Sequence, residues 1–153
     1  MSRCLFVCLG NICRSPMAEG IFQKKVAELR MAVVIDSAAT SHWEDGNPVH
    51  PGTKQLLIQR DIDTSRLFSR QITQEDFATF DWIIGMDQQN VKDLVAIAPA
   101  KFREKIHLYM EVVPGKETNS VPDPWFTGDF EETERMIDEG LPYWLARFAE
   151  AER

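Results

Sequence analysis

Short apolar runs that alternate with segments of helical character are the feature that most constrains the fold of this chain. The runs predicted to be buried strands are Cys4–Val7, Val33–Ile35, Trp82–Ile84 and Ile106–Tyr109. Strand–helix alternation favours a parallel sheet that is covered by helices on both faces. Right-handed crossovers then bring the loops that follow the strands to one edge of the sheet, where ligands bind. The sequence therefore predicts a single α/β domain over residues 1–153 with a site at that edge.

Helices are predicted between and after these strands. They are Pro16–Arg30, His50–Arg60, Thr73–Phe80, Asp87–Ile97 and a last helix that starts near Asp129. Thr73 and Asp87 are predicted to cap their helices, and Pro142 is predicted to kink the last one because it lacks a backbone donor. Residues 114–128 hold three prolines and two glycines without a period. A segment of this kind inside a compact domain is typical of a functional loop.

The composition argues against several classes of function. A net charge of −7 disfavours a nucleic-acid binder, because such a protein needs a basic face. The apolar run Cys4–Leu9 is too short to span a membrane or to form the core of a signal peptide. All three cysteines lie within the first 13 residues, no Cys-x-x-Cys occurs and the histidines are scattered, so neither a disulfide framework nor a metal site is expected. We therefore expect a cytoplasmic protein that uses no metal and no other cofactor.

The loop that follows the first strand has the residues that phosphoryl transfer through sulfur requires. It begins at Cys8 and ends where a helix starts, so backbone N–H groups and the helix dipole favour a bound anion. Gly10 permits a positive φ and Asn11 tolerates one, while Arg14 suits a bidentate grip on two phosphoryl oxygens. The same donors, together with Ser15, would stabilise a nucleophilic thiolate at Cys8. On these residues alone, a buried cysteine without a function remains an alternative.

Several longer motifs occur along the chain. They are C-L-G-N-I-C-R-S-P-M-A-E from Cys8, D-S-A-A-T-S-H-W at Asp36–Trp43, R-Q-I-T-Q-E-D-F-A-T-F-D at Arg70–Asp81 and D-P-W at Asp123–Trp125. Together and in this order they resemble the low-molecular-weight protein tyrosine phosphatases, and the match covers nearly the whole chain. The resemblance implies a four-stranded parallel sheet flanked by helices on both faces, with a phosphate-binding loop after the first strand. It also implies a metal-free, two-step hydrolysis of phosphotyrosine.

The resemblance further implies a role for each residue of the loop. Cys8 would be the nucleophile that forms a phosphocysteine, and Arg14 would bind the phosphate together with the backbone of the loop. The loop residues concerned are Leu9, Gly10, Asn11, Ile12, Cys13, Arg14 and Ser15. Asn11 would hold the strained loop through a hydrogen bond with Ser37, and Ser15 would help to keep Cys8 ionised.

The general acid and the walls of the pocket would lie outside that loop. Asp123 would protonate the phenolate leaving group and then deprotonate the water of the second step, although an Asp-Pro pair taken alone is more often a surface turn. Trp43 and Trp125 would form aromatic walls around the substrate ring; the alternative is that either is packed in the core. Cys13 would form a reversible disulfide with Cys8 or be an inert small residue packed under the loop.

The chain departs from the family pattern in two places. The family often carries a histidine a few residues before the R-Q-I-T motif, and residues 64–69 contain none. Hydrogen bonds that support the loop must therefore come from elsewhere. Many eukaryotic members have paired tyrosines after Asp-Pro, whereas this chain has Trp-Phe, so regulation by phosphorylation at that point is not expected. Tyr109 and Tyr143 remain as phosphorylation candidates.

Proteins of three other kinds share parts of this pattern. Thioredoxin-coupled arsenate reductases need further cysteines, and none follows Cys13. Protein arginine phosphatases carry threonine where Ile12 stands, so phosphotyrosine is the preferred substrate. A non-catalytic phosphotyrosine-binding module would require neither the nucleophile nor the acid. The expected partner is a tyrosine-phosphorylated protein, and the chain is expected to be a monomer or to self-associate weakly.

Overall fold

In the computed structural model, which describes all 153 residues, the strands form one sheet in the order β2–β1–β3–β4. The strands are β1 (Ser2–Cys8), β2 (Val33–Ala39), β3 (Trp82–Gly85) and β4 (Ile106–Leu108). All neighbouring strands are parallel, which confirms the predicted α/β architecture. The predicted fourth strand is one residue too long, because Tyr109 begins a 3-10 helix.

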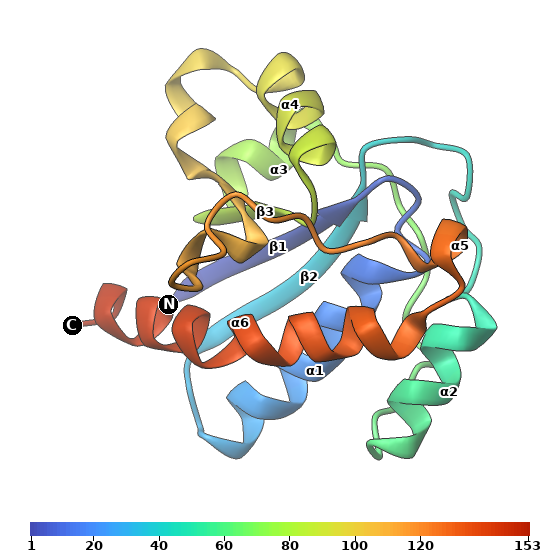
Figure 1. Cartoon of the computed structure of the whole chain (residues 1–153). Helices are drawn as coiled ribbons and strands as arrows, with labels where there is room; N and C mark the ends of the chain where they lie inside the picture. The colour runs from blue at the N-terminus through green and yellow to red at the C-terminus, as the bar shows by residue number, and fades with distance from the viewer.

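The helices cover both faces of this sheet (Figure 1). They are α1 (Arg14–Glu28), α2 (Pro51–Gln59), α3 (Gln74–Thr79), α4 (Gln88–Ile97), α5 (Pro124–Thr127) and α6 (Phe130–Ala151), with 3-10 turns at Ala100–Lys105 and Tyr109–Val112. Helices α1 and α6 lie on one face, and α3 and α4 lie on the other. None of these helices combines the length and the hydropathy that a membrane span requires.

Alternation of side chains along β1 divides the core into two layers. Phe6 and Cys8 belong to the larger layer, which α1 and α6 cover with Phe22, Trp144 and other apolar side chains. Leu5 and Val7 belong to the smaller layer under α3 and α4. Because successive residues of a strand point to opposite faces, Cys8 at the end of β1 lies on the α1 side of the sheet. The first helix starts on that same side, six residues further along the chain.

The predicted helix starts are confirmed at three places. Thr73 Oγ1 accepts from the Asp76 N–H at 3.3 Å, Asp87 Oδ1 accepts from the Asn90 N–H at 2.6 Å, and Asp129 caps α6. These contacts satisfy donors that a helix start otherwise leaves unpaired. Helix α6 continues for nine residues beyond Pro142, and the kink at that residue stays a prediction.

Tyr109 is fully buried, which removes it from the phosphorylation candidates. Its hydroxyl donates to the Ile137 carbonyl at 2.5 Å, and its own carbonyl accepts from Trp144 Nε1 at 2.8 Å. The ring lies so close to Gly140 that a Cβ there would be 2.6 Å from a ring carbon. A kinase could reach this hydroxyl only after the core had opened. Tyr143, by contrast, is partly exposed on α6.

Candidate active site

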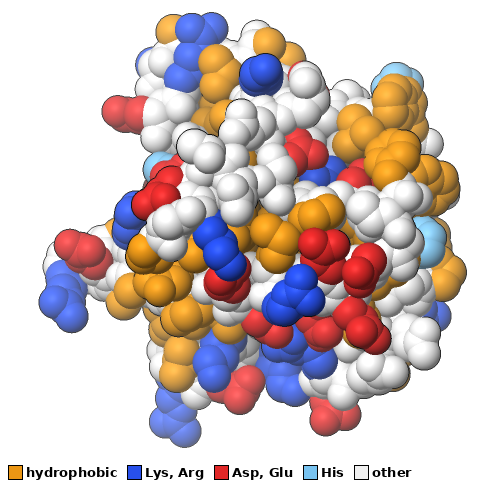
Figure 2. Space-filling view, viewed as in Figure 1, with side chains coloured by type: hydrophobic (Ala, Val, Ile, Leu, Met, Phe, Trp, Pro, Cys, Tyr) orange, Lys and Arg blue, Asp and Glu red, His pale blue; other side chains and the backbone are white.

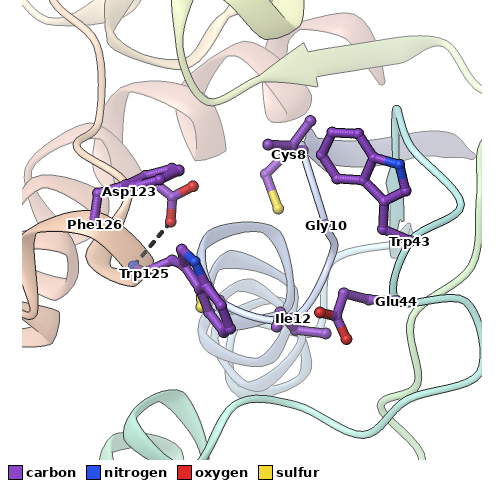
Figure 3. A pocket seen from close by; sticks show the side chains of 10 residues that line it. Cys8, Gly10, Ile12, Trp43, Glu44, Asp123, Trp125 and Phe126 are labelled. Carbon is purple, nitrogen blue, oxygen red and sulfur yellow. Dashed lines mark hydrogen bonds between the residues drawn. The ribbon is translucent and has the colours of Figure 1, made fainter.

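A pocket opens at the carboxyl end of β1, which is where the topology predicts a ligand site. Loops from distant parts of the sequence supply its walls. The lining residues are Cys8, Leu9, Gly10, Ile12, Cys13, Trp43, Glu44, Asp123, Trp125 and Phe126. Figure 3 shows the sulfur of Cys8 pointing into the middle of this pocket, with Trp43 on one side and Asp123 and Trp125 on the other. The structure thus brings the first and last sequence motifs together.

The Cys8 loop, residues 8–15, wraps around the cysteine sulfur. The Asn11 N–H donates to Cys8 Sγ at 3.2 Å, and Ser15 Oγ lies 3.0 Å from the same atom. Helix α1 begins at Arg14, two residues earlier than the sequence suggested, so its N-terminus adjoins the loop. The positive end of the helix dipole favours negative charge at this position.

Asn11 takes the left-handed backbone conformation of this loop, with a φ of 56°. Of the two loop residues for which a positive φ is acceptable, Asn11 takes it and Gly10 does not. Asn11 tolerates this conformation, and its side chain is fixed on both sides. Oδ1 accepts from the Arg70 N–H at 3.1 Å, and Nδ2 donates to Ser15 Oγ at 2.7 Å and to Ser37 Oγ at 2.9 Å. A glycine at this place would provide the backbone conformation without these contacts.

Donors from other segments bind the carbonyl groups of the Cys8 loop. The Ser41 hydroxyl donates to the Leu9 carbonyl at 2.8 Å, and the Ser69 hydroxyl donates to the Gly10 carbonyl at 2.8 Å. The Ile12 and Cys13 carbonyls are held in the same way, by the His50 N–H at 2.9 Å and the Thr53 hydroxyl at 3.1 Å. Ser69 therefore provides loop support from the segment that lacks a histidine. The sequence carried no signal for these four donors, since nothing in their spacing relates them to the loop.

These four carbonyl oxygens of the Cys8 loop thus accept hydrogen bonds from the segments that surround the loop. The N–H groups of Gly10, Ile12, Cys13 and Arg14 have no acceptor within the protein. Buried N–H groups without a partner are rare in proteins. Unpaired N–H donors in a loop that leads into a helix N-terminus are suited to bind an anion.

Arg14 is almost completely buried beneath this loop, at 2 % exposure. Nη1 donates to Asp87 Oδ2 at 2.6 Å and to the Val121 carbonyl at 3.0 Å, while Nη2 makes a longer contact of 3.4 Å with Asp123 Oδ2. Its Nε is buried and has no partner. Asp87 therefore caps α4 with one carboxylate oxygen and orients Arg14 with the other; sequence analysis identified only the cap.

Asp123 faces the loop from the opposite wall of the pocket. It is the N-cap of α5, and its Oδ1 accepts from the Trp125 N–H at 3.0 Å (Figure 3). The side chain is 19 % exposed, so one carboxylate oxygen remains accessible from the pocket. The cap fixes the orientation of the carboxyl group, and the prolines on both sides restrict its backbone. Residues 114–128 thus contain a short helix that sequence analysis did not predict.

Exposed aromatic side chains form the rim of the pocket. Trp43 and Trp125 are 71 % and 58 % exposed, so neither is a core residue. Figure 2 shows hydrophobic side chains gathered at this edge of the molecule, over α5 and the loops beside it. The ring of His50 packs edge-on against Trp125 at 5.8 Å between centroids and stacks on Phe130 at 4.9 Å, which holds the wall against α6. Glu44 also lines the pocket and was not anticipated from the sequence.

Cys13 lines the same pocket as Cys8, and both are free thiols. Burial, reinforced by the negative charge of Cys8, raises the pKa of the Cys13 thiol to about 12. Cys13 is therefore protonated at neutral pH and is a weak nucleophile in this state. A disulfide between the two cysteines stays a prediction.

Comparison with known proteins identifies the family. The family model described as "Low molecular weight phosphotyrosine protein phosphatase" matches residues 3–153. The low molecular weight protein-tyrosine-phosphatase YfkJ of Bacillus subtilis is 41% identical over 144 residues, which are 93% of this chain and 92% of the relative. The crystal structure of YfkJ superposes with a TM-score of 0.95 over 100% of this chain and 98% of that one. The Drosophila arginine phosphatase DARP superposes with a TM-score of 0.86 at 31% identity, over 97% and 98% of the two chains.

The matched region includes the Cys8 loop, the loop of Trp43 and the segment that carries Asp123. Sequence motifs, sheet order and pocket therefore lead to one conclusion. The chain belongs to the low molecular weight phosphotyrosine protein phosphatase family.

Proposed function

We propose that this protein hydrolyses phosphotyrosine esters through a phosphocysteine intermediate on Cys8. The observation that carries the proposal is the set of donors in the Cys8 loop that have no acceptor within the protein. They are the buried Nε of Arg14 and the N–H groups of the neighbouring loop residues. A phosphoryl dianion would supply acceptors for all of them at once. The phosphorus atom would then face the sulfur.

In the first step, the Cys8 thiolate attacks phosphorus in line with the phenolic oxygen of the substrate. The S–P bond forms as the P–O bond to tyrosine breaks, and Asp123 gives its proton to the departing phenolate. Arg14 and the loop N–H groups stabilise the charge on the equatorial oxygens. The fixed contact between Asp87 and Arg14 Nη1 leaves Nε and Nη2 for this purpose.

In the second step, the Asp123 carboxylate takes a proton from a water molecule as its oxygen attacks phosphorus. The P–S bond breaks, inorganic phosphate forms and the Cys8 thiolate is restored. Ser15 Oγ, at 3.0 Å from the sulfur, stabilises the thiolate as a leaving group. No metal enters this sequence of steps.

The rim of the pocket supports an aromatic ester as the substrate. Trp43 and Trp125 flank the sulfur, and flat rings stack favourably on a phenyl group. Ile12 lines the pocket at the position where arginine phosphatases carry threonine. A tyrosine-phosphorylated protein in the cytoplasm is therefore the proposed partner. Protein arginine phosphatase activity is the second candidate, because DARP is similar in structure.

The test compares the hydrolysis of phosphotyrosine, phosphoserine and phosphoarginine by the wild type and by Cys8→Ser. We expect the wild type to turn over phosphotyrosine fastest and Cys8→Ser to have no turnover while still binding phosphate. Full activity in Cys8→Ser would exclude the phosphocysteine mechanism. A much faster turnover of phosphoarginine would exclude the proposed substrate, and phosphotyrosine binding without turnover by the wild type would indicate a binding module.

A further inference from the structure

Glu19 is a buried carboxyl group that the steps above do not use. It lies on α1, one turn beyond the Cys8 loop, and is 8 % exposed. The Ser37 hydroxyl donates to its Oε1 at 2.5 Å, and Gln23 Nε2 donates to its Oε2 at 3.1 Å. Buried carboxyl groups are uncommon unless they are paired with a cation. No cation makes a hydrogen bond or an ion pair with Glu19, so its position requires an explanation.

A continuous chain of hydrogen bonds joins Glu19 to the sulfur of Cys8. The hydroxyl hydrogen of Ser37 is directed at Glu19, so the Ser37 oxygen is free to accept from Asn11 Nδ2 at 2.9 Å. The same amide nitrogen donates to Ser15 Oγ at 2.7 Å. Ser15 accepts this bond with its oxygen and keeps its own hydrogen for Cys8 Sγ at 3.0 Å.

The donor-to-acceptor direction of this hydrogen-bond chain is fixed at both ends. The Arg70 backbone N–H, which is only a donor, binds Asn11 Oδ1 at 3.1 Å, so the amide nitrogen must face the two serines. An ionised Glu19 only accepts, so Ser37 must donate to it. A protonated Glu19 is a weaker acceptor and gives Ser37 no such constraint. The charge on Glu19 therefore determines how firmly the hydrogen atoms of this hydrogen-bond chain are oriented.

The surroundings of Glu19 bring its ionisation into the neutral range. Burial raises its pKa to about 7; the hydrogen bond from Ser37 works against this shift, and the nearby Asp36 adds to it. Arg70 lowers the pKa, but its guanidinium is held by Asp36 at 3.1 Å and Asp76 at 2.9 Å. The charged groups that line the groove beside Glu19 are Lys24, Asp61, Asp63 and Arg66.

We propose that Glu19 is a positioning residue for the reaction proposed above. As a carboxylate it orients Ser37, Asn11 and Ser15, so that the Ser15 hydroxyl is held as a donor to Cys8 Sγ. This inference rests on the proposed function and adds a group that touches neither the substrate nor the reacting atoms. It predicts that the benefit of Glu19 is present only when its carboxyl group is ionised.

The experiment measures kcat and KM for p-nitrophenyl phosphate in the wild type and in Glu19→Gln from about pH 5 to about pH 8.5. The ratio of the two kcat values removes the pH dependence that the two proteins have in common. We expect the ratio to be near one at acid pH and to rise to about fivefold at alkaline pH, since a charge-assisted hydrogen bond is replaced by a neutral one. The midpoint should lie near the pKa of about 7, with KM unchanged.

A double-mutant cycle tests whether the effect passes through Ser37. In a Ser37→Ala background, Glu19→Gln should have no further effect on kcat, because the hydrogen bond from the Ser37 hydroxyl to Glu19 is already lost. The matched control is Glu28→Gln on the exposed part of α1, for which the kcat ratio should stay at one at every pH. If Glu19→Gln does not fold, the ratio of wild type to Ser37→Ala should show the same midpoint.

Three results would overturn the role of Glu19. The first is a kcat ratio that does not change with pH. The second is an effect of Glu19→Gln that is undiminished in the Ser37→Ala background. The third is a fall in kcat that is accompanied by a fall in the Tm of the variant. The Cys8→Ser variant separates these failures from failure of the proposed function. If the wild type shows no Cys8-dependent turnover, both proposals fall; if it does and the ratio is flat, only the role of Glu19 falls.

Discussion

The buried carboxyl group of Glu19 should make the stability of this protein fall as the pH rises through a defined window. Its pKa is raised by burial from an ordinary value of 4.5 to about 7 in the folded state. Between these two values, the folded protein keeps a proton that the unfolded chain has lost. Stability therefore decreases with rising pH across this window and is constant beyond it, as far as Glu19 is concerned.

The size of the effect follows from the shift. One pKa unit corresponds to about 1.4 kcal/mol, so a shift from 4.5 to about 7 corresponds to a loss of about 3 kcal/mol between mildly acid and mildly alkaline pH. A small domain has about 5–15 kcal/mol of unfolding free energy. Ionisation of Glu19 thus removes a considerable part of the unfolding free energy. Gln is close in shape and cannot ionise, so Glu19→Gln should keep this stability at high pH.

Urea denaturation followed by circular dichroism measures this directly. The unfolding free energy of Glu19→Gln minus that of the wild type should be near zero at about pH 4.5 and should rise by about 3 kcal/mol by about pH 8. The difference between the two proteins removes the contribution of all other titrating groups. A difference that is constant with pH would show that Glu19 has an ordinary pKa and would refute the reasoning. A Gln variant that is less stable at alkaline pH would do the same.

Other predictions concern the site and the core. Asp123→Asn should slow the hydrolysis of phosphotyrosine more than that of an ester with a better leaving group, because only the former needs a proton; equal losses for both esters would contradict the assigned acid. Treatment with a metal chelator should leave the turnover rate unchanged, and activity that is lost and then restored by added metal would disprove the mechanism. Gly140→Ala should lower the unfolding free energy by about 1–3 kcal/mol, since its Cβ would lie 2.6 Å from the Tyr109 ring; an unchanged urea midpoint would show that the ring can move.

The sequence predicted the parts of this structure that depend on local chemistry. The strands were recognised from apolar runs, and the starts of α3 and α4 from capping residues, because these signals lie within a few residues of their effect. The place of Cys8 at the end of a parallel strand followed from the handedness of crossovers. Asp123 and the two tryptophans of the rim came from the resemblance, and the structure puts them around the same pocket.

The contacts that join distant segments could not be predicted in this way. Ser69 binds a loop carbonyl 59 residues away, and Asp87 binds Arg14 across 73 residues. Such pairs depend on how the segments pack, and a serine or an aspartate in a sequence gives no sign of its partner. For a related reason, the sequence did not decide which of Gly10 and Asn11 is the left-handed residue of the loop. Gly10 has the freer backbone, but the side-chain contacts of Asn11 with two serines and Arg70 favour the asparagine.

The carbonyl groups of the Cys8 loop are held by residues from several separate segments, and this arrangement bears on when the protein becomes chemically competent. Ser41, His50, Thr53 and Ser69 reach the loop only after β2, α2 and the following segment have docked. In a nascent or partly folded chain, the loop would lack these contacts and would not be held in shape around Cys8. If Cys8 is the nucleophile, as proposed, the loss of a single docked segment would stop turnover before the chain as a whole unfolds.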